Sequence, residues 1–173
     1  ELLTELRISD GFTGTVGVVG AAATLSITAA TIVIDCAAKI VLNTSASNLV
    51  MIERTAGGDD AVQLSGTIET LRVLDARGTV VLGELYTTSV ADLEILGGRF
   101  ATVEINAQTT LAAAPVSMNE GTLKIYGMAV AATGTWDIIG GTVELHAGDY
   151  TTATLDIWNN ARVEDKRDAN STI

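Results

Sequence analysis

The chain has 173 residues, a length that suits one folded domain, and its formal net charge at pH 7 is −11. Apolar residues make up 47% of the chain and charged residues 18%, which excludes a disordered protein because disordered chains are poor in aliphatic residues. The negative charge disfavours nucleic acid as a partner, and we expect no membrane partner because no apolar run of about 18 residues is free of turn signals.

In chain order, we predict an N-terminal arm over residues 1–11, a single β domain over residues 12–165 and a C-terminal tail over residues 166–173. Within the domain, triplets of apolar, variable and apolar residues recur between Gly-rich or Asn-rich turns, the period-two pattern of a strand with one buried face. The triplets begin at Leu25, Ile32, Ile40, Leu71, Val80, Leu93, Val103, Leu123, Trp136, Val143, Leu155 and Val163. We expect the middle residue of each triplet to point to solvent.

The triplets belong to a longer repeat. Residues 71–82 match residues 93–105 at an offset of 22, and Val143 matches Val163 at an offset of 20. A period of this size is typical of a solenoid. An antiparallel sandwich is the competing architecture, but the Asn-Gly or Asp-Gly turns that hairpins favour are absent from the repeats. The expected fold class is therefore all-β, a parallel β-helix or solenoid with roughly 20–22 residues per coil and about three short strands in each.

Charge is distributed unevenly along this domain. Residues 11–52 carry only Asp35 and Lys39, whereas residues 53–173 carry twenty-five charged residues. The domain therefore divides into poorly charged coils over residues 12–52 and acidic coils over residues 53–165. A large uncharged surface would need a cover, which self-association or docking onto a larger assembly could supply. An ordinary surface rich in Thr and Ala is the alternative.

In the second half, the middle residue of the triplet is usually acidic. We expect these carboxylates to lie on different faces or to alternate with Arg72 and Lys124, because like charges on neighbouring strands repel. A solvated face is favoured over a ladder of divalent cations, since no Asp-rich calcium-binding repeat occurs. The acidic middle residues are Glu94, Glu104, Asp137, Glu144, Asp156 and Glu164.

We predict no catalytic, cofactor or metal site. His146 is the only histidine and is expected at an exposed turn, and no Gly-x-Ser-x-Gly elbow supplies a nucleophile. One His and one Cys cannot complete a zinc site, and Cys36 is interpreted as a small buried hydrophobe. The glycines at 14, 17 and 20 are interpreted as turn residues, because the lysine of a P-loop is missing.

A saccharide site is the weaker hypothesis. The pair Asp59-Asp60, expected in a turn, could act as glycosidase carboxylates. The aromatic residues that could stack on a sugar are Trp136, Trp158, Tyr86, Tyr126 and Tyr150. The tripeptides at Asn43 and Asn170 match the glycosylation pattern, which is common by chance.

The repeat from Gly140 to Asp165 resembles the short β-solenoid proteins among the structural genes of tailed bacteriophages. The shared pattern is Gly-Gly-Thr-Val-x-Leu, then Thr-x-Thr-Leu-x-Ile, an Asn-rich turn and Ala-x-Val-x-Asp. The likeness covers residues 67–165 by repeats and residues 12–66 by general character, with an irregular segment over residues 110–122.

The resemblance implies a virion protein on the particle surface that decorates or cements the capsid. Its partners would be the major capsid protein or other virion proteins, together with further copies of itself in a homo-oligomer, with no enzymatic activity and no cofactor. The alternative is a tailspike or tail-fibre domain that binds or cleaves host polysaccharide, and a bacterial adhesin fragment is a third hypothesis.

Overall fold

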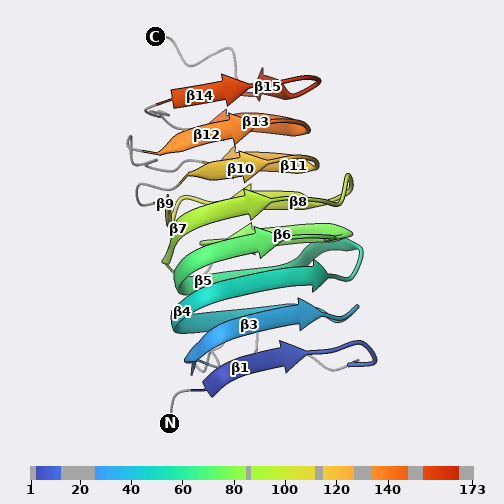
Figure 1. Ribbon diagram of the computed structural model, residues 1–173, viewed down its shortest axis with the longest axis vertical. Coiled ribbons are helices and arrows are strands. Elements are labelled where there is room, and N and C mark those ends of the chain that lie inside the picture. The colour runs from blue at the N-terminus through green and yellow to red at the C-terminus, as the bar shows by residue number, and fades with distance from the viewer. Residues whose placement is uncertain are drawn as a thin grey trace.

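A computed structural model describes residues 3–12, 26–84, 87–111, 115–126, 134–147 and 154–167. These residues form β-strands and no helix. Figure 1 shows a rod of stacked coils, with the N-terminus at one end and the C-terminus at the other. The strands are β1 (Leu3–Ile8), β2 (Ser26–Ile27), β3 (Ala29–Asp35), β4 (Ile40–Arg54), β5 (Gly58–Val73), β6 (Gly78–Leu82), β7 (Thr88–Ile95), β8 (Thr102–Ile105), β9 (Thr109–Leu111), β10 (Val116–Met118), β11 (Thr122–Tyr126), β12 (Thr135–Ile138), β13 (Thr142–Ala147), β14 (Thr154–Ile157) and β15 (Arg162–Asp165).

The described strands pair in parallel, and each coil takes about 21 residues, so the predicted β-solenoid is confirmed. A first ladder runs through β1, β3, β4, β5, β7, β10, β12 and β14. A second runs on the opposite side through β4, β5, β6, β8, β11, β13 and β15. The long strands β4 and β5 bend around a corner and contribute to both.

A third, shorter ladder lies at that corner. It joins β2, the middles of β4 and β5, the start of β7, and β9. The coil that contains β6 and β7 therefore contributes one segment to each ladder, as the expectation of about three strands per coil requires. In the preceding coil the chain turns within β5 at Gly66, whose φ is +94° and where a Cβ atom would lie only 1.7 Å from the Thr44 carbonyl oxygen.

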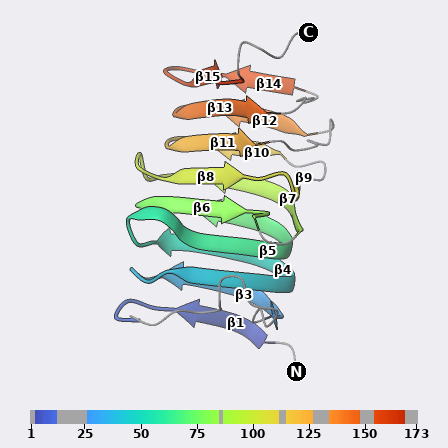
Figure 2. The ribbon, with the colours of Figure 1, turned by 180° about the vertical axis from the view of Figure 1, so that it is seen from behind.

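The coils are right-handed. In Figure 1 the strands of the first ladder face the viewer and point to the right, while the chain climbs from bottom to top. Seen from behind in Figure 2, the strands of the second ladder also point to the right, so in space they run the opposite way. A chain that runs right in front, returns behind and climbs traces a right-handed coil, the hand that parallel β connections favour.

Aliphatic side chains fill the space between the ladders. Leu71 lies beside Leu93, and Leu93 beside Val116, on successive strands of the first ladder, and all three are 0% exposed. Inward side chains stack in the same way on the second ladder, where Val80 and Val103 are neighbours in the core. Burying one such side chain stabilises the fold by about 1.5–3 kcal/mol, so the stack supplies the main favourable energy.

The sequence repeats coincide with the observed register. The 22-residue offset pairs Leu71 with Leu93, and the 20-residue offset pairs Val143 with Val163. The irregular segment over 110–122 still returns to register, since Val116 pairs with Leu93 on one side and Trp136 on the other.

The arm predicted over residues 1–11 is instead part of the solenoid. Strand β1 pairs in parallel with β3, and Leu6 and Ile8 lie beside Ile32 and Ile34. A single strand before Gly11 carries too short a pattern to be recognised as a repeat. At the other end, the Lys166 amide donates a hydrogen bond to the Leu145 carbonyl, which extends the last ladder by one residue into the predicted tail.

The stacked core gives a matched pair of substitutions. Leu93→Ala removes a side chain with 0% exposure, so the free energy of unfolding should fall by about 3 kcal/mol. Leu96→Ala removes the same atoms from a residue that is 36% exposed and should cost less than about 1 kcal/mol. Urea unfolding followed by circular dichroism measures both, and equal losses would contradict this core.

Candidate functional site

His146 lies on β13 rather than at an exposed turn, so that prediction is wrong. Its imidazole stacks on the ring of Tyr126, with centroids 4.4 Å apart and planes at 25°, and its Nε2 lies 2.9 Å from Glu144 Oε2. The strand continues two residues past the triplet, which places Glu144 and His146 on the same outer side. The arrangement orients an imidazole, but no Ser or Cys nucleophile contacts it in the part of the chain described.

The other residues singled out from the sequence are dispersed. Cys36 is fully buried, as predicted. The pair Asp59-Asp60 lies in β5 rather than in a turn, with side chains outside the described set. Thr44, within the Asn43 tripeptide, is buried and its hydroxyl donates to the Thr67 carbonyl.

The five aromatic residues do not form a common platform in the described chain. Trp136 is 5% exposed and belongs to the core, whereas Trp158 is 57% exposed at a corner. The ring of Tyr126 is stacked against the imidazole of His146. Tyr86 and Tyr150 lie outside the described residues, as do the glycines at 14, 17 and 20 and the tripeptide at Asn170.

The outward acidic residues partly alternate with cations, as predicted. Arg72 forms an ion pair with Glu94 on the next strand of the first ladder. On the second ladder, Lys124 Nζ lies 3.2 Å from Glu104 Oε1. Partial burial acts against the charge on Lys124, but the hydrogen bond and charge of Glu104 outweigh it and raise the pKa of the ammonium group.

One pair of neighbouring carboxylates has no such cation. Asp137 and Asp156 are direct neighbours on β12 and β14, and among the described residues no Lys or Arg forms an ion pair with either. Like charges at adjacent strand positions destabilise the sheet. The last two strands at the C-terminal end of the first ladder therefore carry two neighbouring carboxylates that no described Lys or Arg pairs with.

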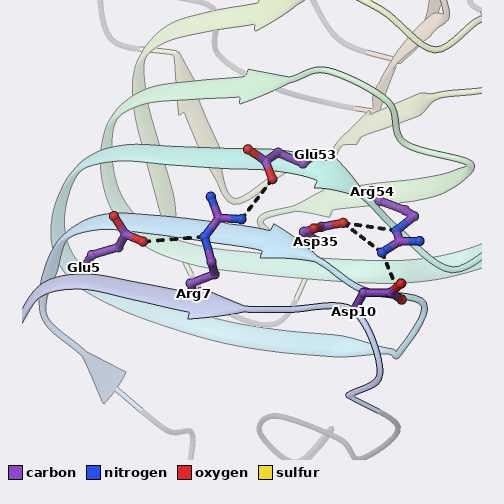
Figure 3. Close-up of polar contacts among 6 residues, drawn as sticks. All are labelled: Glu5, Arg7, Asp10, Asp35, Glu53 and Arg54. Carbon is purple, nitrogen blue, oxygen red and sulfur yellow. Dashed lines mark hydrogen bonds and ion pairs between the residues drawn. The ribbon is translucent and has the colours of Figure 1, made fainter.

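Two uncharged outward side chains in the described part of residues 12–52 are buried by the chain itself. Val33 and Val41 occupy middle, outward positions of their triplets, yet they are 1% and 4% exposed. Arg7 and Glu53 reach across β3 at this level, and their side chains are joined by a 3.1 Å contact (Figure 3). The poorly charged coils therefore offer less free surface than their composition suggests.

A second ion-pair group continues this network at the N-terminal end. Arg54 Nη2 lies 2.9 Å from Asp10 Oδ1 and 3.0 Å from Asp35 Oδ1, and Figure 3 shows the guanidinium between the two carboxylates. The hydrogen bond that the Arg54 guanidinium donates to the Asp10 carboxylate is the main reason that the pKa of Arg54 is raised. These contacts join the segment after β1 to β3 and β4 across successive coils.

Exposed apolar side chains occupy three positions at the corner that leads from the first ladder to the second, and the exposed Asn119 occupies the equivalent position on the strand between the first two of them. Leu96, Ile139 and Trp158 each follow directly after the last inward residue of a triplet, and they are 36%, 41% and 57% exposed. Backbone hydrogen bonds continue the ladder to these positions, such as Trp158 N to the Ile138 carbonyl. We call these three residues the corner column. A hollow of about 240 Å³ beside it is lined by Ile139, Trp158, Asp137 and Asn159.

A second apolar surface is the end of the core. Leu155 and Ile157 occupy the same inward positions as Trp136 and Ile138 on the strand below. Their exposures are 41% and 49%, against 5% and 0% for those two neighbours. We call Leu155 and Ile157 the open rung.

Sequence reasoning missed both surfaces. The signal for the corner column was a large apolar residue directly after a triplet and before a Gly or Asn turn, as at Leu96, Ile139 and Trp158. The triplet pattern does not distinguish the open rung from the buried core, because the exposure of Leu155 and Ile157 depends on their position in the stack.

Among the described residues, no group of three or more His, Cys, Asp or Glu side chains is placed to hold a metal ion. No helix long and apolar enough to cross a bilayer occurs in the described part of the chain. No protein-family model matches the sequence, and neither does any curated protein or solved structure.

The Glu104–Lys124 pair can be tested by titration. In Glu104→Gln the pKa of Lys124 should fall, because burial disfavours the charged ammonium group and the carboxylate that offsets this effect is removed. Because the pKa of Lys124 is raised in the folded state, the pair stabilises the fold fully at pH values below the pKa of the lysine in the unfolded chain. This contribution is lost as the pH rises through the pKa in the folded state. NMR of the lysine ε-carbon measures the shift, and Glu164→Gln is the control. An unchanged pKa in Glu104→Gln would show that the pair does not form in solution.

Proposed function

We propose that this chain is a structural protein of a tailed-bacteriophage particle that decorates or cements the capsid. Its role is non-covalent binding, in which a stiff rod presents side chains at fixed positions to the major capsid protein or another virion protein. No covalent bond is made or broken. The resemblance of its repeats to phage structural solenoids supports this proposal.

The observation that carries the proposal is the corner column. Large apolar residues exposed along one corner of a rigid support, here with the exposed Asn119 between Leu96 and Ile139, are typical of protein interfaces. Burying them on a partner removes apolar surface from water. Leu96 and Ile139 lie on coils that are otherwise acidic. The contact surface is therefore proposed at this corner rather than on the poorly charged coils, where Val33 and Val41 are already buried.

The second candidate function is a tail-fibre or tailspike domain that binds host polysaccharide. The hollow beside Trp158 favours it, since an exposed indole next to the carboxylate of Asp137 and the amide of Asn159 offers a stacking surface with hydrogen-bonding groups. The hollow is small and open, and one indole provides a single stacking position, which ranks this candidate below the structural one.

Binding to particles tests the proposal. Purified protein should co-sediment with capsids of the encoding phage that lack it, and electron cryomicroscopy should show a rod at regular positions on the shell. The double variant Leu96→Ser/Ile139→Ser removes two exposed residues of the corner column, so its capsid affinity should fall about tenfold or more.

Phe12→Ser is the matched control, since Phe12 is also 36% exposed but lies near the N-terminal end. Its capsid affinity should not change. Purified virions that contain no copy of the chain would contradict the structural role. Release of reducing ends from host polysaccharide would support the second candidate instead.

A further inference from the structure

Asp137 is an outward carboxylate inside the first ladder. It lies on β12 between Ser117 of β10 and Asp156 of β14, so a described strand pairs with it on each side. Its Oδ1 atom is buried, and no described residue donates a hydrogen bond to it. A buried polar atom without a partner costs stability. A hydrogen-bond donor from another molecule would therefore bind favourably at Asp137.

Asp137 lines the hollow of about 240 Å³ beside the corner column. The hollow lies on the flank of the rod, between the coil of β12 and the coil of β14, and it involves neither the inward residues of the core nor the open rung. The backbone amide of Trp158 donates to the Ile138 carbonyl, which fixes the position of that residue. The other lining residues are Ile139, Trp158 and Asn159.

The charge at this place favours a cation. Asp137 and Asp156 are neighbouring carboxylates with which no described Lys or Arg pairs. All ten Lys and Arg residues of the chain lie within the described ranges, so the chain itself offers no other cation for the pair. A cationic group from another molecule would relieve the repulsion between the two carboxylates, as Lys124 does beside Glu104.

The walls of the hollow select a guanidinium group. The indole of Trp158 is 57% exposed, and a planar guanidinium both stacks on an indole and pairs with a carboxylate through two hydrogen bonds. Ile139 offers an apolar contact for the aliphatic stem of an arginine side chain. Pockets for drug-sized molecules begin at about 300 Å³, so this smaller hollow suits one side chain better than an oligosaccharide.

We propose that the hollow binds an arginine side chain of a protein partner. The guanidinium stacks on Trp158 and pairs with Asp137, while Asp156 adds negative charge beside it. The inference rests on the proposed function, because it names the chemistry of the virion partner next to the corner column. The partner surface then carries an arginine adjacent to the apolar side chains that cover Ile139.

An NMR titration with N-acetyl-arginine amide tests the hollow without any partner protein. The indole N–H signal of Trp158 should shift in a saturable way, whereas the neutral analogue N-acetyl-citrulline amide should leave it unchanged. Asp137→Asn keeps the shape of the side chain and removes its charge, so arginine binding should weaken about threefold or more. Asp75→Asn is the matched control, since Asp75 is exposed on an earlier turn and does not line the hollow.

Three results of this titration would overturn the proposal. They are the absence of a shift at Trp158 with the arginine probe, equal shifts with the citrulline probe, and equal weakening in Asp137→Asn and Asp75→Asn. A saturable shift with a neutral oligosaccharide, and none with the arginine probe, would assign the hollow to the second candidate function instead.

Co-sedimentation with capsids separates this inference from the proposed function. The double variant Asp137→Asn/Asp156→Asn should fold at least as stably, because it removes a like-charge pair, and its capsid affinity should fall about tenfold. If it binds capsids as well as the unaltered protein does, the arginine contact is wrong and the structural role stands. If the unaltered protein binds no capsid but still binds the arginine probe through Asp137, the structural role fails and the arginine site stands.

Discussion

Burial of aliphatic side chains along a single axis is the interaction on which the rest of this structure depends. Each coil is too small to bury its own inward residues, so each needs the coils above and below it. The register that pairs Leu71 with Leu93 and Leu93 with Val116 keeps those three side chains at 0% exposure. Where the described coils end, the same positions are filled by Leu155 and Ile157 and stay open. The shared register is therefore the constraint that stabilises the rod.

The register that stacks the core also stacks whatever points outward. At about 4.8 Å between strands, neighbouring outward charges must be of opposite sign or must repel. Arg72 with Glu94 and Lys124 with Glu104 satisfy this condition, while Asp137 with Asp156 does not. The departure from alternation lies beside the open rung and the corner column.

The sequence allowed the fold class, the coil length and much of the register to be predicted, because apolar triplets and their 20- and 22-residue offsets report directly on stacking. It did not reveal that β4 and β5 run unbroken around a corner, since β5 bends at Gly66 and β4 changes register between Thr44 and Ser47, with no loop at either place. The prediction of an exposed turn at His146 was wrong because β13 continues past the triplet, where His146 stacks on Tyr126. The exposure of the open rung was not predicted, because Leu155 and Ile157 have the same triplet pattern as Trp136 and Ile138, and that pattern does not report exposure.

Nuclear Overhauser contacts between backbone protons of neighbouring strands test the central claim most directly. The account predicts contacts between strands at Leu71 and Leu93, at Leu93 and Val116, and at Val116 and Trp136, each in the pattern of parallel pairing. Contacts that instead join each strand to the next one along the chain in an antiparallel pattern would contradict the stacked core and the surfaces derived from it.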